Sequence, residues 1–215
     1  MKSKKAIGAM WILALLPVVL VLVCLPGLPE RVPTHWNLDG TVTYSSRAAL
    51  WILAGISPAV AALFQFLPRL DPKRRNYEKF QGWYDGMGVL LALFLLLCMV
   101  ITLSESLHPG RISVSRAIGL AIGVLFLVIG NMMGKVKSNW FMGFRTPWAL
   151  SDPDVWNKTQ RMGGRVIFIA GLSCFPLSLL APEKVFLGIF LLILFGGVAL
   201  TYVMSWKWYR EKRAS

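Results

Sequence analysis

The sequence predicts an all-α protein, a polytopic membrane bundle of six transmembrane helices. Of its 215 residues, 56% are hydrophobic and only 15% are charged, whereas a soluble domain needs more charged residues to cover its surface. The mean hydropathy is +0.60. Six apolar windows lack Asp, Glu, Lys, Arg and His, and roughly 17–25 apolar residues form a helix that crosses a hydrocarbon core. The windows are Ala6–Leu25, Ala48–Leu67, Met87–Leu103, Ala117–Met133, Val166–Ala181 and Val185–Met204.

The first and fifth windows are the least regular of the six. Basic residues precede the first window, as they would in a signal peptide. That window is longer than the apolar core of a signal peptide, which is about 7–15 residues, and Leu25–Pro29 lacks a small-x-small cleavage site. We therefore interpret it as a retained span. Val166–Ala181 is the shortest window and contains Pro176, so it is the weakest of the predicted spans.

The basic residues are distributed unevenly between the loops. The N-terminal tail and residues 69–79, 135–165 and 207–213 together hold 18 of the 23 Lys and Arg residues. With six spans these segments share one side, and the positive-inside rule predicts that this side, with both termini, is the cytoplasm. The net charge of +13 then reflects topology and attraction to anionic headgroups, and we expect no direct nucleic-acid binding.

The first outer loop, residues 26–47, has the pattern of a short strand followed by a turn. Val32, Thr34 and Trp36 alternate with other residues, as the side chains of a strand do. The following Asn-Leu-Asp-Gly, residues 37–40, supplies the turn. We therefore expect an extended segment that reverses direction outside the membrane.

The spacing of the candidate ligands does not favour a metal or a cofactor. A metal site is the alternative to a structural or partner-contact role for His35, and its candidate ligands lie in outer loops: His35, His108, Asp39 and Glu30. The three cysteines have no CxxC spacing and lie within or at the end of spans: Cys24, Cys98 and Cys174. We therefore expect neither a zinc site nor a disulfide framework.

The long fourth loop, residues 134–164, combines three tryptophans with helix-start signals. Ser151 is a capping residue, a proline follows it, and an acidic residue lies at the positive end of the helix dipole. The pattern predicts a short amphipathic interfacial helix at Ser151–Met162 that ends at Gly163-Gly164. We expect Trp156 on this helix to face the membrane or the span bundle.

The segment Gly143–Trp148 before this helix is predicted to be non-helical, because Thr146 precedes a proline. Arg145 lies close to aromatic residues on both sides and could stack on a ring or bind a phosphate. On spacing alone, an interfacial anchor without a further role is the alternative interpretation of this loop.

Glycines recur at four-residue spacing in and after the fourth span, at Gly119, Gly123, Gly130 and Gly134. Small residues at this spacing let helices in a membrane approach closely. We expect the glycines to serve packing within the molecule, with a dimer face as the alternative.

In the first outer loop and in the long fourth loop, the sequence resembles the SdpI family of bacterial membrane proteins. Residues 28–40 resemble the motif of an N-terminal domain of unknown function, DUF1648, and the long loop resembles the core motif of the family. One departure is Gln160, where many relatives have His. The resemblance implies functional roles in the long loop for Asn131, Asn139, Gly143, Arg145, Thr146, Pro147, Trp148, Trp156, Arg161, Gly163 and Gly164. In the outer loop it implies such roles for Pro33, His35, Trp36, Asn37 and Gly40.

The resemblance implies an immunity protein of the bacterial cytoplasmic membrane that gives resistance to a secreted, membrane-active peptide toxin. In some family arrangements the immunity protein is also a receptor that recruits a cytosolic repressor. The resemblance further implies an N-terminal two-span unit at residues 1–67 and an SdpI-like four-span unit at residues 68–215. The oligomeric state stays open.

The residues themselves leave two alternatives to an immunity protein. One is a small transporter or lipid-handling protein in which Arg145 binds phosphate headgroups, and the other is a membrane enzyme with His35, Glu30 and Asp39 at its site. The windows contain none of the ionisable residues that ion pathways need. Because no catalytic constellation of carboxylates or of Ser, His and Asp is visible either, we expect that the protein is not an enzyme.

Overall fold

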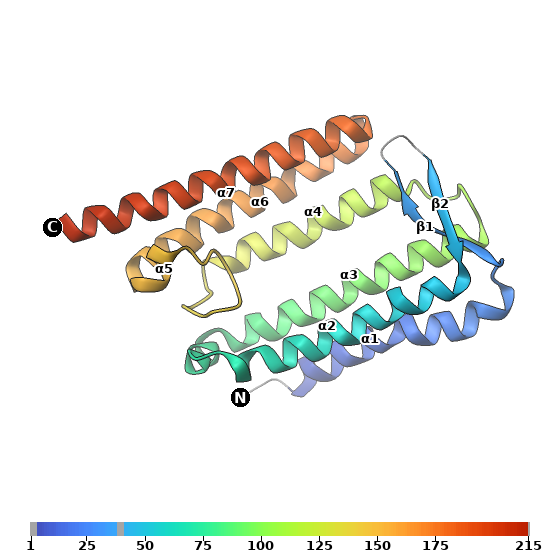
Figure 1. Ribbon diagram of the computed structural model, residues 1–215, viewed down its shortest axis with the longest axis horizontal. Helices are drawn as coiled ribbons and strands as arrows, with labels where there is room; N and C mark the ends of the chain where they lie inside the picture. The colour runs from blue at the N-terminus through green and yellow to red at the C-terminus, as the bar shows by residue number, and fades with distance from the viewer. Residues whose placement is uncertain (1–3, 38–40, 215) are drawn as a thin grey trace. The chain divides into compact units, whose positions relative to one another are not determined.

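The computed structural model describes residues 4–37 and 41–214. Within these residues, six helices are long and apolar enough to cross a membrane (Figure 1). They are α1 (Lys4–Cys24), α2 (Leu50–Leu70), α3 (Gln81–Leu107), α4 (Val114–Met133), α6 (Pro153–Leu180) and α7 (Glu183–Ala214). The predicted all-α, multi-pass membrane architecture is therefore confirmed.

Shorter elements lie between these helices. The predicted strand is confirmed as β1 (Arg31–Trp36), which pairs antiparallel with β2 (Val42–Ser46). The register runs from Arg31 opposite Ser46 to Trp36 opposite Val42, with an irregularity between Pro33 and His35. The other short elements are η1 (Leu25–Gly27), η2 (Arg47–Ala49), η3 (Arg74–Phe80) and α5 (Pro147–Ser151).

The chain packs as two compact units. One, which we call the hairpin unit, comprises Lys2–Phe66 and Asp85–Ala121 and includes both strands. The other, the long-loop unit, comprises Leu67–Tyr84 and Ile122–Ser215. The predicted boundary near residue 67 between a two-span and a four-span unit stays a prediction.

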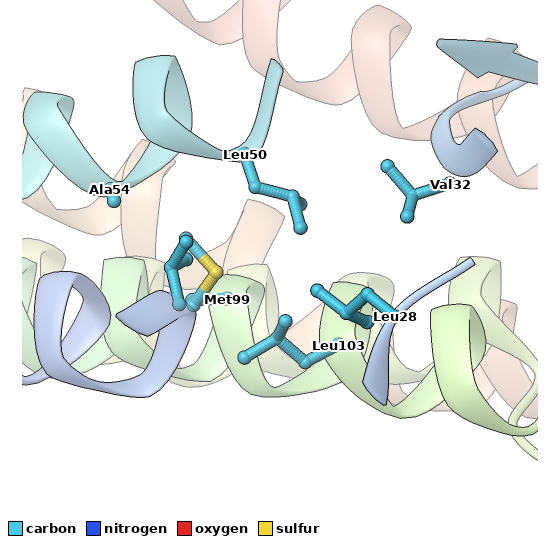
Figure 2. Packing of buried hydrophobic residues seen from close by; sticks show 7 residues of the cluster. Leu28, Val32, Leu50, Ala54, Met99 and Leu103 are labelled. Carbon is cyan, nitrogen blue, oxygen red and sulfur yellow. The ribbon is translucent and has the colours of Figure 1, made fainter. Parts of the chain in front are cut away.

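The core of the hairpin unit joins its helices to its strands. Met99 of α3 and Leu50 of α2 are fully buried with Val32 of β1, as Figure 2 shows. This contact attaches the two-stranded sheet to the ends of the helices through an apolar side chain. A second cluster joins α1, α2 and α3 and contains Met10, Ala14, Ala61 and Ala92.

In the long-loop unit, helices α4 and α6 approach each other at two pairs of glycines. A Cβ atom at Gly130 would lie 2.5 Å from the Phe168 amide nitrogen and 2.6 Å from the Gly164 carbonyl oxygen. Seven residues earlier on α4, a Cβ atom at Gly123 would lie 3.1 Å from the Gly171 carbonyl oxygen. Because the close neighbours include backbone atoms, larger side chains at these sites would push the helices apart. For Gly123 and Gly130 the structure therefore confirms packing within the molecule.

The prediction of a separate helix that ends at Gly163-Gly164 was wrong. Helix α6 starts at Pro153 and continues through both glycines to Leu180. Asp152 caps it, and its Oδ1 accepts hydrogen bonds from the Asp154 and Val155 amides at 2.8 and 3.0 Å. Each glycine lets a neighbour pack closely against the continuous helix: the Phe144 ring lies against Gly163, and α4 lies against Gly164. This packing offsets the roughly 1 kcal/mol that a glycine costs inside a helix relative to alanine.

Candidate functional site

The connection between α4 and α6, residues 134–152, contains only the short helix α5, yet many of its residues have defined hydrogen-bond partners. One fixed point is Asp71, whose side chain is buried at the start of the turn before η3. Its Oδ2 accepts hydrogen bonds from the Tyr77 hydroxyl at 2.9 Å and from the Trp140 amide at 2.8 Å. Its Oδ1 accepts from the Lys73 amide at 2.7 Å. One buried carboxylate thereby joins the turn after α2, η3 and the α4–α6 connection, with charge-assisted hydrogen bonds.

Asn139 shapes the backbone next to this carboxylate. Its side chain is fully buried, and its Oδ1 accepts from the Phe141 and Met142 amides at 2.9 and 2.6 Å. Its Nδ2 donates to the Lys137 and Met142 carbonyl oxygens at 2.9 and 3.2 Å. An aspartate lacks the two N–H donors, so only an amide satisfies all four backbone groups.

The segment between α2 and α3 makes three more hydrogen bonds to this region. Lys73 Nζ donates to Ser138 Oγ at 2.8 Å and to the Leu150 carbonyl oxygen at 3.3 Å. Asn76 Nδ2 donates to the Ser138 carbonyl oxygen at 2.8 Å. These bonds cross 62 to 77 residues of sequence. They hold the connection against the segment between α2 and α3.

Gln160 holds the next part of the connection. It is fully buried on α6, its Oε1 accepts from the Phe144 amide at 3.0 Å, and its Nε2 donates to the Phe144 carbonyl oxygen at 2.8 Å. Gly143 has a φ of +90°, and a Cβ atom there would lie 2.3 Å from Gln160 Oε1. Glycine is therefore required both by the backbone conformation and by the approach of the amide. The neutral Gln160 side chain thus clamps the backbone of Phe144 through a donor and an acceptor.

A buried cluster of hydroxyl groups joins α5, α6 and α7. Thr146 caps α5 by accepting from the Ala149 amide at 3.0 Å, and its Oγ1 lies 2.6 Å from Ser205 Oγ. Thr159 Oγ1 lies 3.0 Å from the same Ser205 oxygen. All three hydroxyl-bearing side chains are buried, so their pairing removes the cost of isolated polar groups.

Trp156 faces the bundle, as predicted. It is 1% exposed, and its Nε1 donates to the Val136 carbonyl oxygen at 2.8 Å. Trp148 is half-buried and packs edge-on against Tyr202 of α7, with ring centroids 5.5 Å apart. Both tryptophans therefore attach the connection to its own unit.

Three residues of the connection remain on the surface, and one of them, Arg145, belongs to the predicted motif. Trp140 is 51% exposed and Phe141 36%, and the exposed Arg145 donates a hydrogen bond to the Trp140 carbonyl oxygen. We call these three residues the tip. The other exposed residues of the predicted motif are Asn131, Gly143, Pro147 and Arg161.

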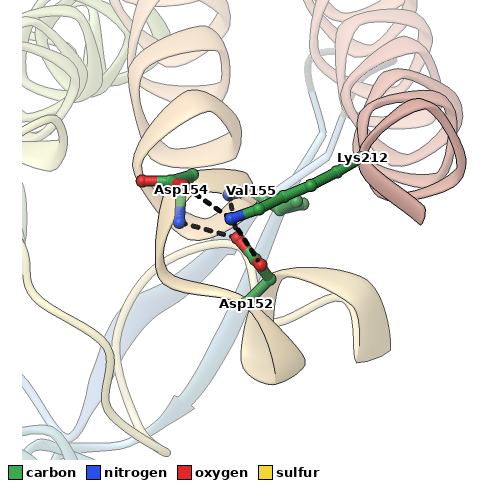
Figure 3. A network of polar contacts seen from close by, with 4 residues as sticks. All are labelled: Asp152, Asp154, Val155 and Lys212. Atoms are coloured by element: carbon green, nitrogen blue, oxygen red, sulfur yellow. Dashed lines mark hydrogen bonds and ion pairs between the residues drawn. The ribbon is translucent and has the colours of Figure 1, made fainter. Parts of the chain in front are cut away.

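The C-terminal end of α7 is attached to the start of α6 by ion pairs (Figure 3). Lys212 Nζ lies 2.8 Å from an Asp152 carboxylate oxygen and also pairs with Asp154. The hydrogen bond from Lys212, followed by that from the Val155 amide, holds the pKa of Asp152 below its usual value. The helix cap and the last turn of α7 are thus linked electrostatically.

In the outer loop the predicted residues have mainly structural surroundings. Pro33 is buried in β1, Trp36 is half-buried, and His35 is exposed. Asn37 closes the hairpin with two hydrogen bonds to Thr41. Its backbone N–H donates to the Thr41 carbonyl oxygen and its side-chain Nδ2 donates to Thr41 Oγ1, each at 2.9 Å. Gly40 lies outside the described residues. The described residues, which leave out Asp39, contain no cluster of three His, Cys, Asp or Glu side chains that could hold a metal ion.

Sequence reasoning missed the partners that hold the motif. Asp71, Tyr77 and Ser205 were not expected to belong to the site, although each bonds to the connection or to its buried cluster. Asp71 left a weak signal, since it is one of only two acidic residues in the strongly basic segment 69–79. Ser205 lies in the polar boundary of the last span and gave no comparable signal.

Comparison with known proteins finds matches in two regions, one from the α4–α6 connection into α7 and one from α1 into α2. Residues 135–205 match the SdpI/YfhL protein family, and residues 12–57 match the domain of unknown function DUF1648. The chain is 24% identical over 188 residues to "Immunity protein SdpI" of Bacillus subtilis (strain 168), which covers 87% of this chain and 88% of that protein. No solved structure matches the chain. The resemblance is therefore confirmed, and this multi-pass membrane protein carries an SdpI/YfhL family region preceded by a DUF1648 region.

Proposed function

We propose that this protein is an integral membrane immunity protein that gives resistance to a secreted, membrane-active peptide toxin. The similarity to an immunity protein over most of both chains carries this proposal. In this proposal the protein is not an enzyme, needs no cofactor, and acts in the bacterial cytoplasmic membrane. Its partners are the lipid bilayer and the toxin.

The tip supports a binding role for the α4–α6 connection. Aromatic and arginine side chains dominate the energetics of many protein interfaces, and Trp140, Phe141 and Arg145 are exposed together. The backbone below them is held by Asp71 and Asn139. Binding of a partner there costs little conformational entropy of the connection, because the connection is already ordered.

The charge distribution supports a division of roles between the two sides of the membrane. With 18 of 23 Lys and Arg residues in the termini and two of the loops, we assign these segments to the cytoplasm. The β-hairpin then lies on the side from which a secreted toxin arrives. The tip lies on the cytoplasmic side, where it serves both protection against a membrane-inserted toxin and recruitment of a cytosolic repressor. The recruitment of such a repressor when toxin is present is the second part of this proposal.

Growth of a toxin-sensitive strain tests the first part. Cells that express the wild-type protein should tolerate a higher concentration of a secreted, membrane-active peptide toxin than cells with an empty vector. Arg145→Lys should lower this tolerance at an unchanged membrane level, because lysine lacks the planar fork of arginine. If the wild type, well expressed, protects against no such toxin while the purified protein moves a solute or cleaves a substrate, the proposal is wrong.

A further inference from the structure

A cavity of about 430 Å³ lies between α6 and α7 in the long-loop unit. Lys158, Arg161 and Arg165 line it together with the apolar side chains of Val166 and Ile169. Trp208 of α7 closes its other side. A larger and more polar cavity of about 620 Å³ shares Lys158, Arg161 and Trp208 with it, so the two form one continuous groove.

The groove changes from basic to apolar along one face of α6. Residues 158, 161, 165 and 169 follow each other at three- and four-residue spacing, which stacks their side chains on the same side of a helix. Arg165 immediately precedes the apolar window that begins at Val166. Ile169, one turn further into the span, is 55% exposed. The cations therefore lie where a membrane span meets the headgroup layer, and the apolar surface lies below them.

These three cations are not neutralised by carboxylates of the described chain. The two acidic residues that line the polar part of the groove have other partners: Asp154 pairs with Lys212, as Figure 3 shows, and Glu211 lies 3.8 Å from Lys207. Among the described residues, no ion pair involves Lys158, Arg161 or Arg165. Like charges at this helical spacing repel each other, so a bound anion would stabilise this part of α6.

We propose that this groove binds one anionic phospholipid of the surrounding leaflet. The headgroup phosphate is held by Lys158, Arg161 and Arg165, since arginine forks match phosphate oxygens. The Trp208 indole lies at the glycerol level, where tryptophan is favoured in membranes. One acyl chain covers Val166 and Ile169. A free phosphate ion would leave that apolar surface uncovered, so the lipid is the ligand that fits both parts of the groove.

Native mass spectrometry of the purified protein in detergent tests this proposal. The protein is titrated with phosphatidylglycerol, with phosphatidylcholine of the same acyl chains, and with inorganic phosphate. The first phosphatidylglycerol should bind at least about tenfold more tightly than phosphatidylcholine, given roughly 1 kcal/mol for each basic residue near an anionic surface. The triple variant K158Q/R161Q/R165Q should lose about a hundredfold in this affinity.

A matched control has the same charge change elsewhere in the unit. Arg74, Arg75 and Lys137 are exposed basic residues outside the groove, and R74Q/R75Q/K137Q should keep the wild-type affinity within about threefold. Ile169→Asn should weaken phosphatidylglycerol binding and leave any binding of inorganic phosphate unchanged. If the triple variant does not fold, Arg165→Gln alone decides, with an expected loss of about fivefold.

Three results would overturn the proposal. In the first, the wild type binds both phospholipids equally well. In the second, the control variant loses as much affinity as the groove variant, which would indicate a general effect of net charge. In the third, inorganic phosphate competes fully with the lipid and Ile169→Asn has no effect, which would indicate a phosphate site without a lipid chain.

Discussion

Replacement of Asp71 should release the α4–α6 connection from the rest of its unit. In Asp71→Asn, one amide oxygen can still accept from the Tyr77 hydroxyl and the Trp140 amide, but the amide nitrogen then faces the Lys73 amide. One hydrogen bond and the charge are lost, which costs about 1–3 kcal/mol. Asp71→Ala leaves all three donors without this acceptor and should cost more.

Hydrogen–deuterium exchange measures this release in the connection itself. A loss of about 2 kcal/mol raises the population of the open loop about thirtyfold, so protection of a peptide that covers residues 138–146 should fall by this factor. Peptides from the hairpin unit should keep their protection. Glu78→Gln is the matched control, because this exposed carboxylate lies on η3, which follows the turn that begins at Asp71, and its loss changes the net charge equally.

Unchanged exchange at residues 138–146 in Asp71→Ala would refute the role of this carboxylate. The reasoning would also fail if Glu78→Gln had the same effect as Asp71→Asn, because the cause would then be the net charge of the turn.

Three further predictions concern packing, topology and pH. Gly130→Ala should lower the free energy of unfolding by about 1–3 kcal/mol, because its Cβ would meet the α6 backbone. Gly196→Ala is the control and should not lower it in this way, because Gly196 has open space around it. Thermal unfolding in detergent compares the two variants. In a cysteine-free background, single cysteines at Thr41 and Lys137 should react with an impermeant reagent from opposite sides of the membrane, and labelling of both from outside would contradict the assigned topology. The lowered pKa of Asp152 stabilises the fold above its unfolded-state pKa near 3.8, and this contribution is lost as the pH falls through the lower folded-state pKa. Lys212→Gln should therefore reduce the loss of stability below about pH 4 in unfolding scans against pH, and an unchanged acid limb would contradict the pairing.

The spans were predictable because hydropathy reports directly on burial in lipid. The windows still underestimated the helices: α3 begins at Gln81, before the window that starts at Met87, and α7 continues to Ala214, past Met204. Polar and basic residues end an apolar window but need not end a helix, since the backbone hydrogen bonds continue outside the membrane. Similarly, Gly163 and Gly164 resembled a helix stop and instead accommodate Phe144 and α4.

For each contact in the site, the residue in the connection was predictable and its distant partner was not. Asn139, Gly143 and Thr146 could be found from their local sequence, because caps and turns depend on neighbouring residues. Their partners could not, since the Trp140 amide bonds to Asp71 across 69 residues and Thr146 to Ser205 across 59. The sequence also did not separate the buried members of the motif from the exposed Arg145, and it did not single out Trp140 and Phe141 of the tip. Both distinctions depend on tertiary packing.

The most direct test of the proposed function is the growth of a toxin-sensitive strain that expresses the double variant Trp140→Ala/Phe141→Ala. This variant removes the exposed aromatic side chains and leaves Asp71, Asn139 and Gln160 in place, so exchange protection of residues 143–160 should match that of the wild type. If the tip is the binding element, this variant should give no more tolerance to toxin than an empty vector, at wild-type membrane levels. Full protection by the variant, with its loop still ordered, would contradict the assignment of function to the tip.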